Sequence, residues 1–283
     1  MSEYPAAEGK VFDITDKPLY IVGAAACDIA ALQSLDVIFL QDEFTDIFYK
    51  SRRESTVVIG MDCTAPLDTC FCTLAGGDPY PREGFDLSLS PSGDNLLVET
   101  GSDVGDDIIA RNKSMFRDAT DLQILERDRI RSDIRQQVSS RNSEFVIERS
   151  RTELLEIMRE SDGWFEHVAT CVGCGACLFA CPTCHCFLLY DQRGENSRFE
   201  RIREWDACIY AGFSRMAGGS SPRLGIMERF RHRYLHKLEY YPKNFGFEAC
   251  TGCGRCIAGC MGQIDMRAVL KDLDTLQRRV QKL

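Results

Sequence analysis

The first hundred residues alternate between short apolar runs and a segment with helical spacing. PLYIVGAA, at 18–25, is an apolar run that ends in small residues, and STVVIGMDC, at 55–63, is a second run typical of a buried strand. Between them, CDIAALQSLDVIFL places apolar residues at positions 29, 32, 35, 38 and 39, the spacing of an amphipathic helix. FDLSLSPSGDNLLVETGS, at 85–102, predicts a hairpin with a Ser-Gly-Asp-Asn turn. We therefore predict an N-terminal α/β domain over 1–105.

The pattern becomes helical and charged after this domain. ATDLQILERDRIRSDIRQQVSSR lies in a long stretch without proline, and we predict a helical connector at 106–165. The C-terminal part, 166–283, contains a repeated cysteine motif whose two copies are separated by an insert at 187–249. We expect this insert to be helical apart from a Gly-Gly-Ser-Ser-Pro loop at 218–222. The final segment, IDMRAVLKDLDTLQRRVQKL, predicts an amphipathic helix.

Length and composition restrict the class of protein. With 283 residues and 44% hydrophobic content, the chain can bury a core without help from disulfides. MSEYPAAEGK has no apolar run of the signal-peptide type, and LYIVGAAACDIAAL is interrupted by Asp28 and too short to span a bilayer. We therefore expect a cytoplasmic protein without direct membrane insertion. In a reducing compartment its fifteen cysteines favour metal ligation, redox chemistry or burial over disulfides.

Charge is distributed unevenly. Residues 1–110 contain six Lys and Arg against twenty Asp and Glu, whereas basic residues concentrate from Arg201 to Lys237. The basic segment could meet an anion, an acidic partner or nucleic acid, or it could be a solvated or internally paired face. The acidic N-terminal half weighs against a nucleic-acid-binding protein, and we predict no nucleic-acid partner.

The repeated cysteine motif has the spacing CxxCxxCxxxC. Three thiolates at three-residue intervals on a loop can each reach a different iron of one cluster, and in two-cluster ferredoxins the fourth cysteine ligates the other cluster. This rule predicts two [4Fe-4S] clusters, whose ligand sets are Cys171, Cys174, Cys177 and Cys260 for the first, and Cys250, Cys253, Cys256 and Cys181 for the second. The 68 residues between Cys181 and Cys250 favour an α-helical ferredoxin-type domain over the compact ferredoxin built on a small sheet.

Other kinds of cysteine site fit this spacing less well. Zinc sites pair CxxC knuckles across longer gaps and do not need three equally spaced thiols with a fourth. The spacing CxxxCxxC of Cys177, Cys181 and Cys184 occurs in radical S-adenosylmethionine enzymes, but it would take two thiols from the duplicated motif. A thioredoxin-like dithiol of Cys181 and Cys184 conflicts in the same way with iron ligation by Cys181.

Seven cysteines lie outside the motifs. Four of them are N-terminal and suffice for one more cluster, which makes a third [4Fe-4S] cluster a candidate at Cys27, Cys63, Cys70 and Cys72. Cys27 and Cys63 follow two predicted strands, and the carboxyl ends of parallel strands meet at one edge of a sheet. Burial as small apolar residues is the alternative. The other three are Cys184, Cys186 and Cys208, which either pack beside a cluster or combine with an N-terminal thiol.

His185 and several arginines lie close to the motifs in sequence. His185 could ligate iron, transfer protons or donate to a cluster sulfide, although a buried, hydrogen-bonded histidine is more common. Positive charge near a cluster raises its reduction potential. We expect this effect from the arginines of the insert, which are Arg215, Arg223, Arg229, Arg231 and Arg233.

An ordered set of segments carries a resemblance to a known family. They are CDIAALQSLDVIFL, VVIGMDCTAPLDTCFCTLAGGDP, CVGCGACLFACPTCHCF, WDACIYAGFSRMAGG, ERFRHRYLHKLEYYP and CTGCGRCIAGC. In this order they resemble the iron-sulfur beta subunit of cytosolic nickel-iron sulfhydrogenases and, equally, the first subunit of anaerobic sulfite reductases. The resemblance implies an electron-transfer subunit beside a flavin- and NAD(P)-binding subunit, with the flavin on that partner and a separate catalytic subunit. It also implies that the eight motif cysteines ligate the clusters.

These observations predict an α+β protein, an N-terminal α/β domain followed by an α-helical ferredoxin-type domain with two [4Fe-4S] clusters. We expect an iron-sulfur electron-transfer subunit of a multi-subunit oxidoreductase that serves a hydrogenase, a sulfur or sulfite reductase, or a related enzyme. The alternative is a catalytic reductase subunit that uses its N-terminal thiols or a bound cofactor, with the clusters as its internal wire. The absence of a GxGxxG loop in the sequence weighs against this alternative.

Overall fold

The N-terminal part of the chain is built on a four-stranded sheet. The structure is a computed structural model that describes residues 17–41, 45–194 and 199–280. The sheet has the order β1-β2-β3-β4, and its strands are β1 (Leu19–Ala25), β2 (Thr56–Met61), β3 (Leu87–Ser92) and β4 (Asn95–Thr100). β1, β2 and β3 are parallel, and β3 and β4 form the antiparallel hairpin predicted from the sequence. The two predicted strands and the hairpin are therefore confirmed.

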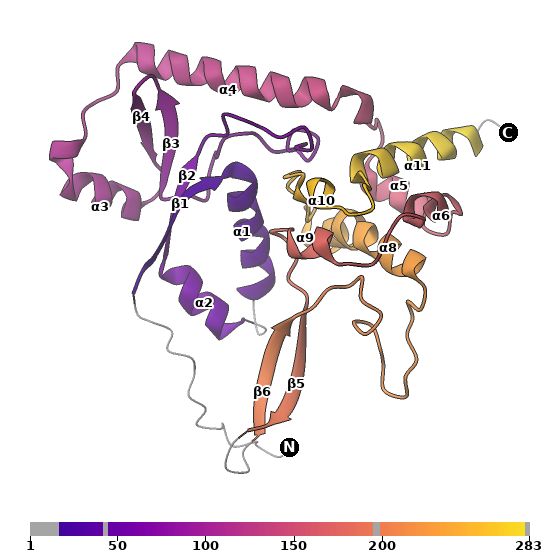
Figure 1. Cartoon of the computed structure of the whole chain (residues 1–283). Coiled ribbons are helices and arrows are strands. Elements are labelled where there is room, and N and C mark those ends of the chain that lie inside the picture. Colours follow the sequence, from indigo (N-terminus) through magenta and orange to yellow (C-terminus); the bar gives the residue numbers. More distant parts are fainter. Residues whose placement is uncertain (1–16, 42–44, 195–198, 281–283) are drawn as a thin grey trace.

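Helix α1 (Ala26–Phe39) follows β1 directly and confirms the predicted helix. It covers the sheet, with α2 (Ile47–Glu54) beyond it (Figure 1). A small core of Ile29, Ala24, Val58 and Phe85 joins α1 to the strands. Because α1 begins at the carboxyl end of β1, its first turn lies beside the residues that follow β2. This placement brings the loops after the two strands to one edge of the sheet.

The segment between the β3–β4 hairpin and the first cysteine motif is mostly helical. Its elements are α3 (Asp103–Arg111), η2 (Lys113–Met115), α4 (Asp121–Arg141), η3 (Ser143–Phe145), α5 (Arg151–Ile157) and α6 (Gly163–Val168). Thr120 caps α4, since its hydroxyl accepts from the Gln123 N–H and the Gln123 side chain accepts from the Thr120 N–H. α4 extends from the β3–β4 hairpin to the neighbourhood of the C-terminal helix, across the top of the molecule in Figure 1. It therefore braces the sheet against the rest of the chain.

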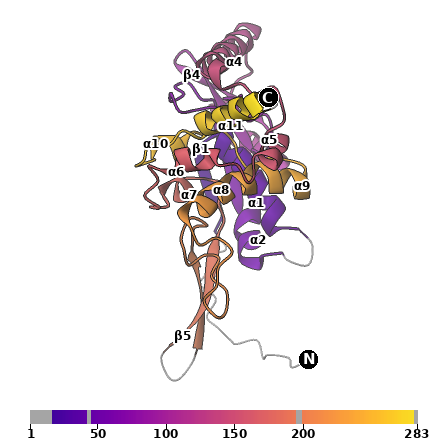
Figure 2. The same cartoon turned by 90° about the vertical axis from the view of Figure 1, so that its right-hand side faces the viewer.

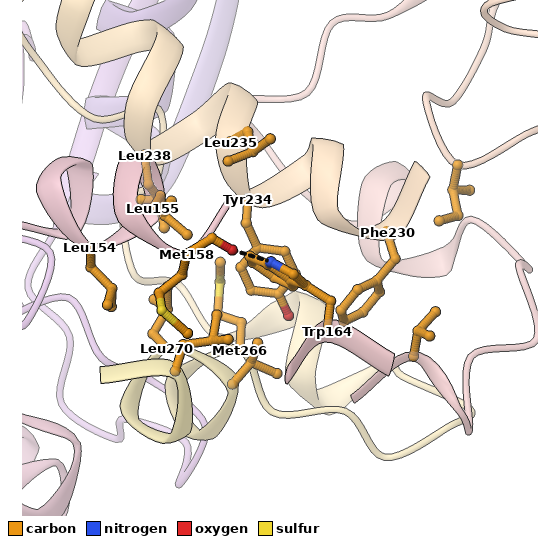
Figure 3. Packing of buried hydrophobic residues seen from close by; sticks show 14 of the residues in the cluster. Leu154, Leu155, Met158, Trp164, Phe230, Tyr234, Leu235, Leu238, Met266 and Leu270 are labelled. Carbon is orange, nitrogen blue, oxygen red and sulfur yellow. Dashed lines mark hydrogen bonds between the residues drawn. The ribbon is translucent and has the colours of Figure 1, made fainter. Parts of the chain in front are cut away.

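The main core lies in the C-terminal half. α8 (Ile226–Leu235), η5 (His236–Tyr240), α9 (Tyr241–Phe245) and α11 (Met266–Val280) pack with α5 and α6 around the fully buried side chains of Trp164 and Tyr234. The Trp164 indole donates to the Met158 carbonyl at 2.8 Å, which satisfies its polar group inside the core (Figure 3). The predicted C-terminal helix is confirmed as α11, and residues 281–283 lie outside the described residues.

The insert does not begin as a helix, which corrects the expectation for 187–249. β5 (Phe187–Arg193) and β6 (Phe199–Trp205) form an antiparallel hairpin that projects from the body (Figures 1 and 2). FLLYDQR and FERIREW are rich in aromatic and branched side chains, which favour strands over helices. Cross-strand pairs, including Arg201 with Asp191 at 2.8 Å, stabilise the arm. The helical part of the insert starts only at α8.

Within the described ranges, no helix combines the length and the apolar character needed to cross a membrane.

Candidate metal centre

The two cysteine motifs fold into the same local structure. Each runs as an irregular loop into a helix of one turn, α7 (Ala176–Phe179) or α10 (Arg255–Ala258). Glycines at corresponding positions have nearly equal left-handed φ angles, 67° and 78° at Gly173 and Gly175, and 64° and 72° at Gly252 and Gly254. Because a side chain would make these angles unfavourable, glycine is required there. α7 and α10 pack together, so the two thiol-rich loops are neighbours.

The first motif lies beside the last cysteine of the second. Burial raises the pKa of the Cys177 thiol, the cation Arg233 opposes this shift, and the thiolates of Cys256, Cys260 and Cys171 add to it. Such effects require short separations. The structure therefore brings Cys260 together with Cys171 and Cys177. Cys174, the remaining cysteine of the predicted set, is exposed.

The second motif lies beside the last cysteine of the first. Burial raises the pKa of Cys250 to about 12, Lys237 opposes this shift, and the Cys256 and Cys181 thiolates contribute to it. Burial also raises the pKa of Cys253, which lies close enough to Cys181 for that thiolate to add to the shift. The last cysteine of the second motif thus lies near Cys177, and the last cysteine of the first motif lies near Cys250 and Cys253.

Two buried cations lie between the motifs, one turn apart on α8 and η5. Arg233 is 6% exposed and Lys237 is 4% exposed. Lys237 Nζ donates to Thr183 Oγ1 at 2.7 Å and to the Ala249 carbonyl at 3.1 Å, and Arg233 Nε has no hydrogen-bond partner among the described residues. Burial opposes the charge of both, but the Cys256 and Cys177 thiolates raise the pKa of Arg233, and those of Cys181 and Cys184 raise the pKa of Lys237. These cations face thiols.

The thiols and cations together fit an anionic iron-sulfur cluster. Soft thiolates are the preferred ligands of such clusters. Four thiolates outweigh the positive charge of the iron-sulfide core, and a buried Lys or Arg is strongly destabilising without a nearby anion. Across the described ranges, no group of three or more His, Cys, Asp or Glu side chains is placed so that it could hold a metal ion.

The loop with the N-terminal cysteines, 63–74, is held against the second motif. The Phe71 N–H donates to the Gly252 carbonyl at 2.8 Å, and the Cys70 thiol to the Cys253 carbonyl at 3.7 Å. Side chains from later elements donate to carbonyls of this loop at distances of 2.8–3.0 Å, and the pairs are Arg141 with Pro66, Arg267 with Asp68, Asn142 with Cys70 and Arg151 with Leu74. A loop without regular structure is thereby fixed in one position.

The four N-terminal cysteines converge. Burial raises the pKa of Cys72 to about 11, and the Cys70 and Cys63 thiolates contribute to this shift. Burial likewise raises the pKa of Cys27 to about 12. The negative charges of Asp28, Cys253 and Cys72 add to this shift, and the cation Arg255 opposes it. Arg255 Nη2 lies 2.7 Å from an Asp28 oxygen and ties α1 to α10. A cavity of about 690 Å³ is lined by Cys27, Cys72 and Cys250.

Gly254 offers a test of the contact between the 63–74 loop and the second motif. A Cβ added at Gly254 would lie 2.2 Å from the Thr69 carbonyl oxygen, whereas at Gly173 the nearest atom would be Ile226 Cδ1 at 3.6 Å. Both residues have positive φ, which costs about 1–2 kcal/mol for alanine. Gly173→Ala should lower the melting temperature by about 2–8 °C, and we expect Gly254→Ala to lower it at least twice as far. Circular dichroism under anaerobic conditions measures both. Equal shifts would contradict the described contact.

The last three cysteines also lie together. The Cys208 thiol lies beside Cys186, which with burial raises the pKa of Cys208, and Cys184 is close enough for its thiolate to raise it further. Cys184 in turn contacts Cys181. His185 is fixed beside them, with Nδ1 3.1 Å from the Thr183 carbonyl oxygen and the Tyr241 hydroxyl 3.3 Å away.

The arginines of the insert, which were expected to raise the cluster potentials, lie in different surroundings. Of these arginines, Arg233 lies among the motif cysteines. Arg231 donates to the Arg159 carbonyl and pairs with Glu160 at 2.9 Å, and Arg229 Nε donates to the Ile209 carbonyl at 2.7 Å. Lys237 was not among the residues predicted to act on a cluster. Its position four residues after Arg233, on a helix face shared with buried Phe230 and Tyr234, is the signal that could have identified it.

Comparisons with known proteins match the region of the two motifs and most of the chain. Residues 170–264, which include both motifs, match the family model of a 4Fe-4S dicluster domain. The chain is 30% identical over 258 residues to Sulfhydrogenase 2 subunit beta of Pyrococcus furiosus, and the alignment covers 91% of this chain and 75% of that protein. No solved structure matches the chain.

Proposed function

The chain belongs to the family of the sulfhydrogenase beta subunit, and from this membership we propose that it relays electrons through two [4Fe-4S] clusters between two partner subunits. One partner would bind flavin and NAD(P), and the other would be a catalytic oxidoreductase subunit. The observation that supports the proposal is the placement of Cys260 near Cys177 and of Cys181 near Cys250, because an exchange of the fourth cysteines between neighbouring motifs would hold two redox centres side by side. The family membership supports an iron-sulfur electron-transfer subunit, and the proposal extends this to cluster number and partners.

We assign the first cluster to Cys171, Cys174, Cys177 and Cys260, and the second to Cys250, Cys253, Cys256 and Cys181. When bound, a [4Fe-4S] cluster supplies one-electron redox chemistry. The chain's own contribution is to hold eight thiolates on two glycine-rich loops and to keep Arg233 and Lys237 buried beside them. These cations favour the state with one more electron. The core around Trp164 and Tyr234 excludes water from the inner side of the site.

We also propose that Cys27, Cys63, Cys70 and Cys72 hold a third [4Fe-4S] cluster. Their convergence and the hydrogen bonds that fix the 63–74 loop support this assignment. The proposed division of the chain is an α/β domain at 1–105, a helical connector at 106–165 and an α-helical ferredoxin-type domain at 166–283. The separate core between α1 and the sheet supports this division.

Iron and acid-labile sulfide analysis of the anaerobically purified chain tests the proposal. Two motif clusters give about eight irons and eight sulfides per chain, and the N-terminal cluster raises each to about twelve. Replacing Cys70 and Cys72 together by alanine should then remove about four irons and leave the motif clusters in place. Zinc without sulfide would overturn the proposed function, whereas about eight irons, unchanged in the double variant, would overturn only the third cluster.

One observation favours a second function, that of a catalytic reductase subunit. The cavity of about 690 Å³ beside Cys27 and Cys72 is large enough for a small ligand. Flavin or another cofactor released when the purified chain is denatured would support this alternative. An isolated chain that binds only iron and sulfide favours the relay.

A further inference from the structure

The first motif reaches the protein surface at Cys174. All fifteen cysteines lie in the described ranges, and of these only Cys174 is exposed. The other seven motif cysteines are partly buried. The Cys174 sulfur is therefore the point at which a cluster held by the first motif is most open to another protein.

Large apolar side chains beside Cys174 are open to solvent. Val172, two residues before it in the same loop, is 70% exposed, and Met261, at the end of the second motif, is 76% exposed. The Thr170 hydroxyl donates to the Gly262 carbonyl at 2.8 Å and holds the two loops side by side. Two exposed apolar side chains from separate motifs thus lie on the same face of the molecule.

Two exposed aromatic rings extend this apolar face. Phe179 of α7 and Tyr210 have ring centroids 6.1 Å apart, and the Tyr210 hydroxyl donates to the Cys174 carbonyl at 3.2 Å. A group of exposed apolar side chains is typical of a surface that contacts another protein. We call this group the Cys174 rim, and its members are Val172, Phe179, Tyr210 and Met261.

The loop that contains Tyr210, at 206–225, adds positive charge beside the rim. Its one carboxylate, Asp206, already accepts from the next backbone N–H at 2.7 Å. Among the described residues, Arg215 and Arg223 form no ion pair, and Arg223 Nε has no hydrogen-bond partner. Arginines without a carboxylate partner, next to an apolar centre, complement a surface that has acidic side chains around an apolar centre.

We propose that the Cys174 rim and its two arginines form the docking surface for a redox partner protein with an acidic contact face. Carboxylates of the partner would pair with Arg215 and Arg223, and its apolar centre would cover the rim. One electron would pass between the partner's redox centre and the cluster of the first motif, so that one is oxidised as the other is reduced. This inference rests on the proposed function, because the transfer needs a cluster behind Cys174.

The charge of the surface is tested with the full chain, loaded anaerobically with iron and sulfide, and with an acidic flavodoxin as the probe. Stopped-flow absorbance follows electron transfer from the reduced chain, and flavin fluorescence follows binding to the oxidised chain. At an ionic strength of about 0.01 M, Arg215→Glu should lower the rate constant and the association constant about tenfold. The difference from the unchanged chain should vanish at about 1 M salt.

Arg117→Glu is the matched control for this charge change. Arg117 is also exposed, but it lies between η2 and α4, on the opposite side of the molecule from α8 (Figure 1). It should change the rate constant and the association constant by less than about twofold. Equal effects of the two substitutions would mean that only net charge matters and would overturn the proposal.

Val172→Ser tests the apolar part of the surface. It should weaken binding of the flavodoxin about fivefold at low and at high salt, because the lost contact is apolar. Leu122→Ser is its control, since Leu122 is 77% exposed on α4, and it should leave binding unchanged. If the Val172 and Leu122 variants bind equally well, the rim is not a contact surface and the proposal is overturned.

Two further measurements separate the possible failures. A dimer of the unchanged chain in analytical ultracentrifugation that Val172→Ser dissociates would identify the rim as a contact between two copies, which would also overturn the proposal. Iron and sulfide are measured in every sample. An unchanged chain without clusters would contradict the proposed function, whereas binding of the flavodoxin does not require a cluster and still tests the docking surface.

Discussion

Replacing Cys181 by alanine should remove the cluster bound by the second motif and spare the cluster of the motif that contains Cys181. The reason is the placement of Cys181 near Cys250 and Cys253, across the contact between α7 and α10. Loss of one thiolate from a cluster of four should cost about four irons per chain. Cys260→Ala should have the reciprocal effect on the cluster of Cys171 and Cys177. Either variant interrupts the relay.

Double variants test whether the fourth cysteine of each motif ligates the cluster of the other motif. If Cys181 and Cys253 ligate the same cluster, replacing both removes no more iron than replacing either one, about four atoms. If Cys260 and Cys253 ligate different clusters, replacing both removes about eight. Iron analysis on the two double variants, prepared in parallel, measures the difference. The opposite outcome is a loss of about eight irons when Cys181 and Cys253 are replaced and of about four when Cys260 and Cys253 are replaced. It would mean that all four cysteines of each motif ligate the same cluster.

Lys237→Met should lower the reduction potential of the cluster assigned to Cys250, Cys253, Cys256 and Cys181. Lys237 is buried beside Cys181 and Cys250 and donates to Thr183 and to the Ala249 carbonyl. Two unit charges about 8 Å apart at an effective dielectric constant of about 20 interact by about 2 kcal/mol. For a one-electron centre this corresponds to roughly 90 mV, so we expect a decrease of about 50–100 mV. A redox titration followed by the spectrum of the reduced cluster measures the shift.

Arg231→Met is the matched control for Lys237→Met. Arg231 lies on the preceding helix, but it pairs with Glu160 at 2.9 Å and donates to the Arg159 carbonyl. Its removal should leave the cluster potentials close to their original values. Equal shifts in the two variants would indicate a general effect of net charge, and an unchanged potential in Lys237→Met would contradict the role assigned to the buried ammonium group.

Local pattern was sufficient to predict much of the fold. The apolar runs that became β1 and β2, the helical spacing that became α1, and the turn between β3 and β4 are all encoded by neighbouring residues. The β5–β6 hairpin was missed, although FLLYDQR and FERIREW have strand-like composition, because the surrounding insert suggested helices. The arm makes few contacts with the body, so the alternating pattern of a half-buried strand is weak there.

Only the part of the candidate site that depends on local ligand spacing was predictable from the sequence. Ligand spacing is a local property of a loop, so both motifs were evident from the sequence. The convergence of Cys27 with Cys72, the burial of Lys237 and the meeting of Cys186 with Cys208 depend on contacts between distant elements. From sequence alone, a lysine within a basic segment is expected to be exposed to solvent. Only the packing of η5 against the motif loops gives Lys237 another role.

A reductive titration of the anaerobically purified chain, followed by electron paramagnetic resonance, tests the central claim most directly. Two neighbouring motif clusters predict at least two one-electron centres, which contribute about two spins per chain on full reduction, and line broadening from their mutual coupling. This intensity should fall by about one spin in Cys181→Ala or in Cys260→Ala. A chain that contains iron and sulfide but gives a single uncoupled centre, or no signal that depends on the motif cysteines, would contradict the account.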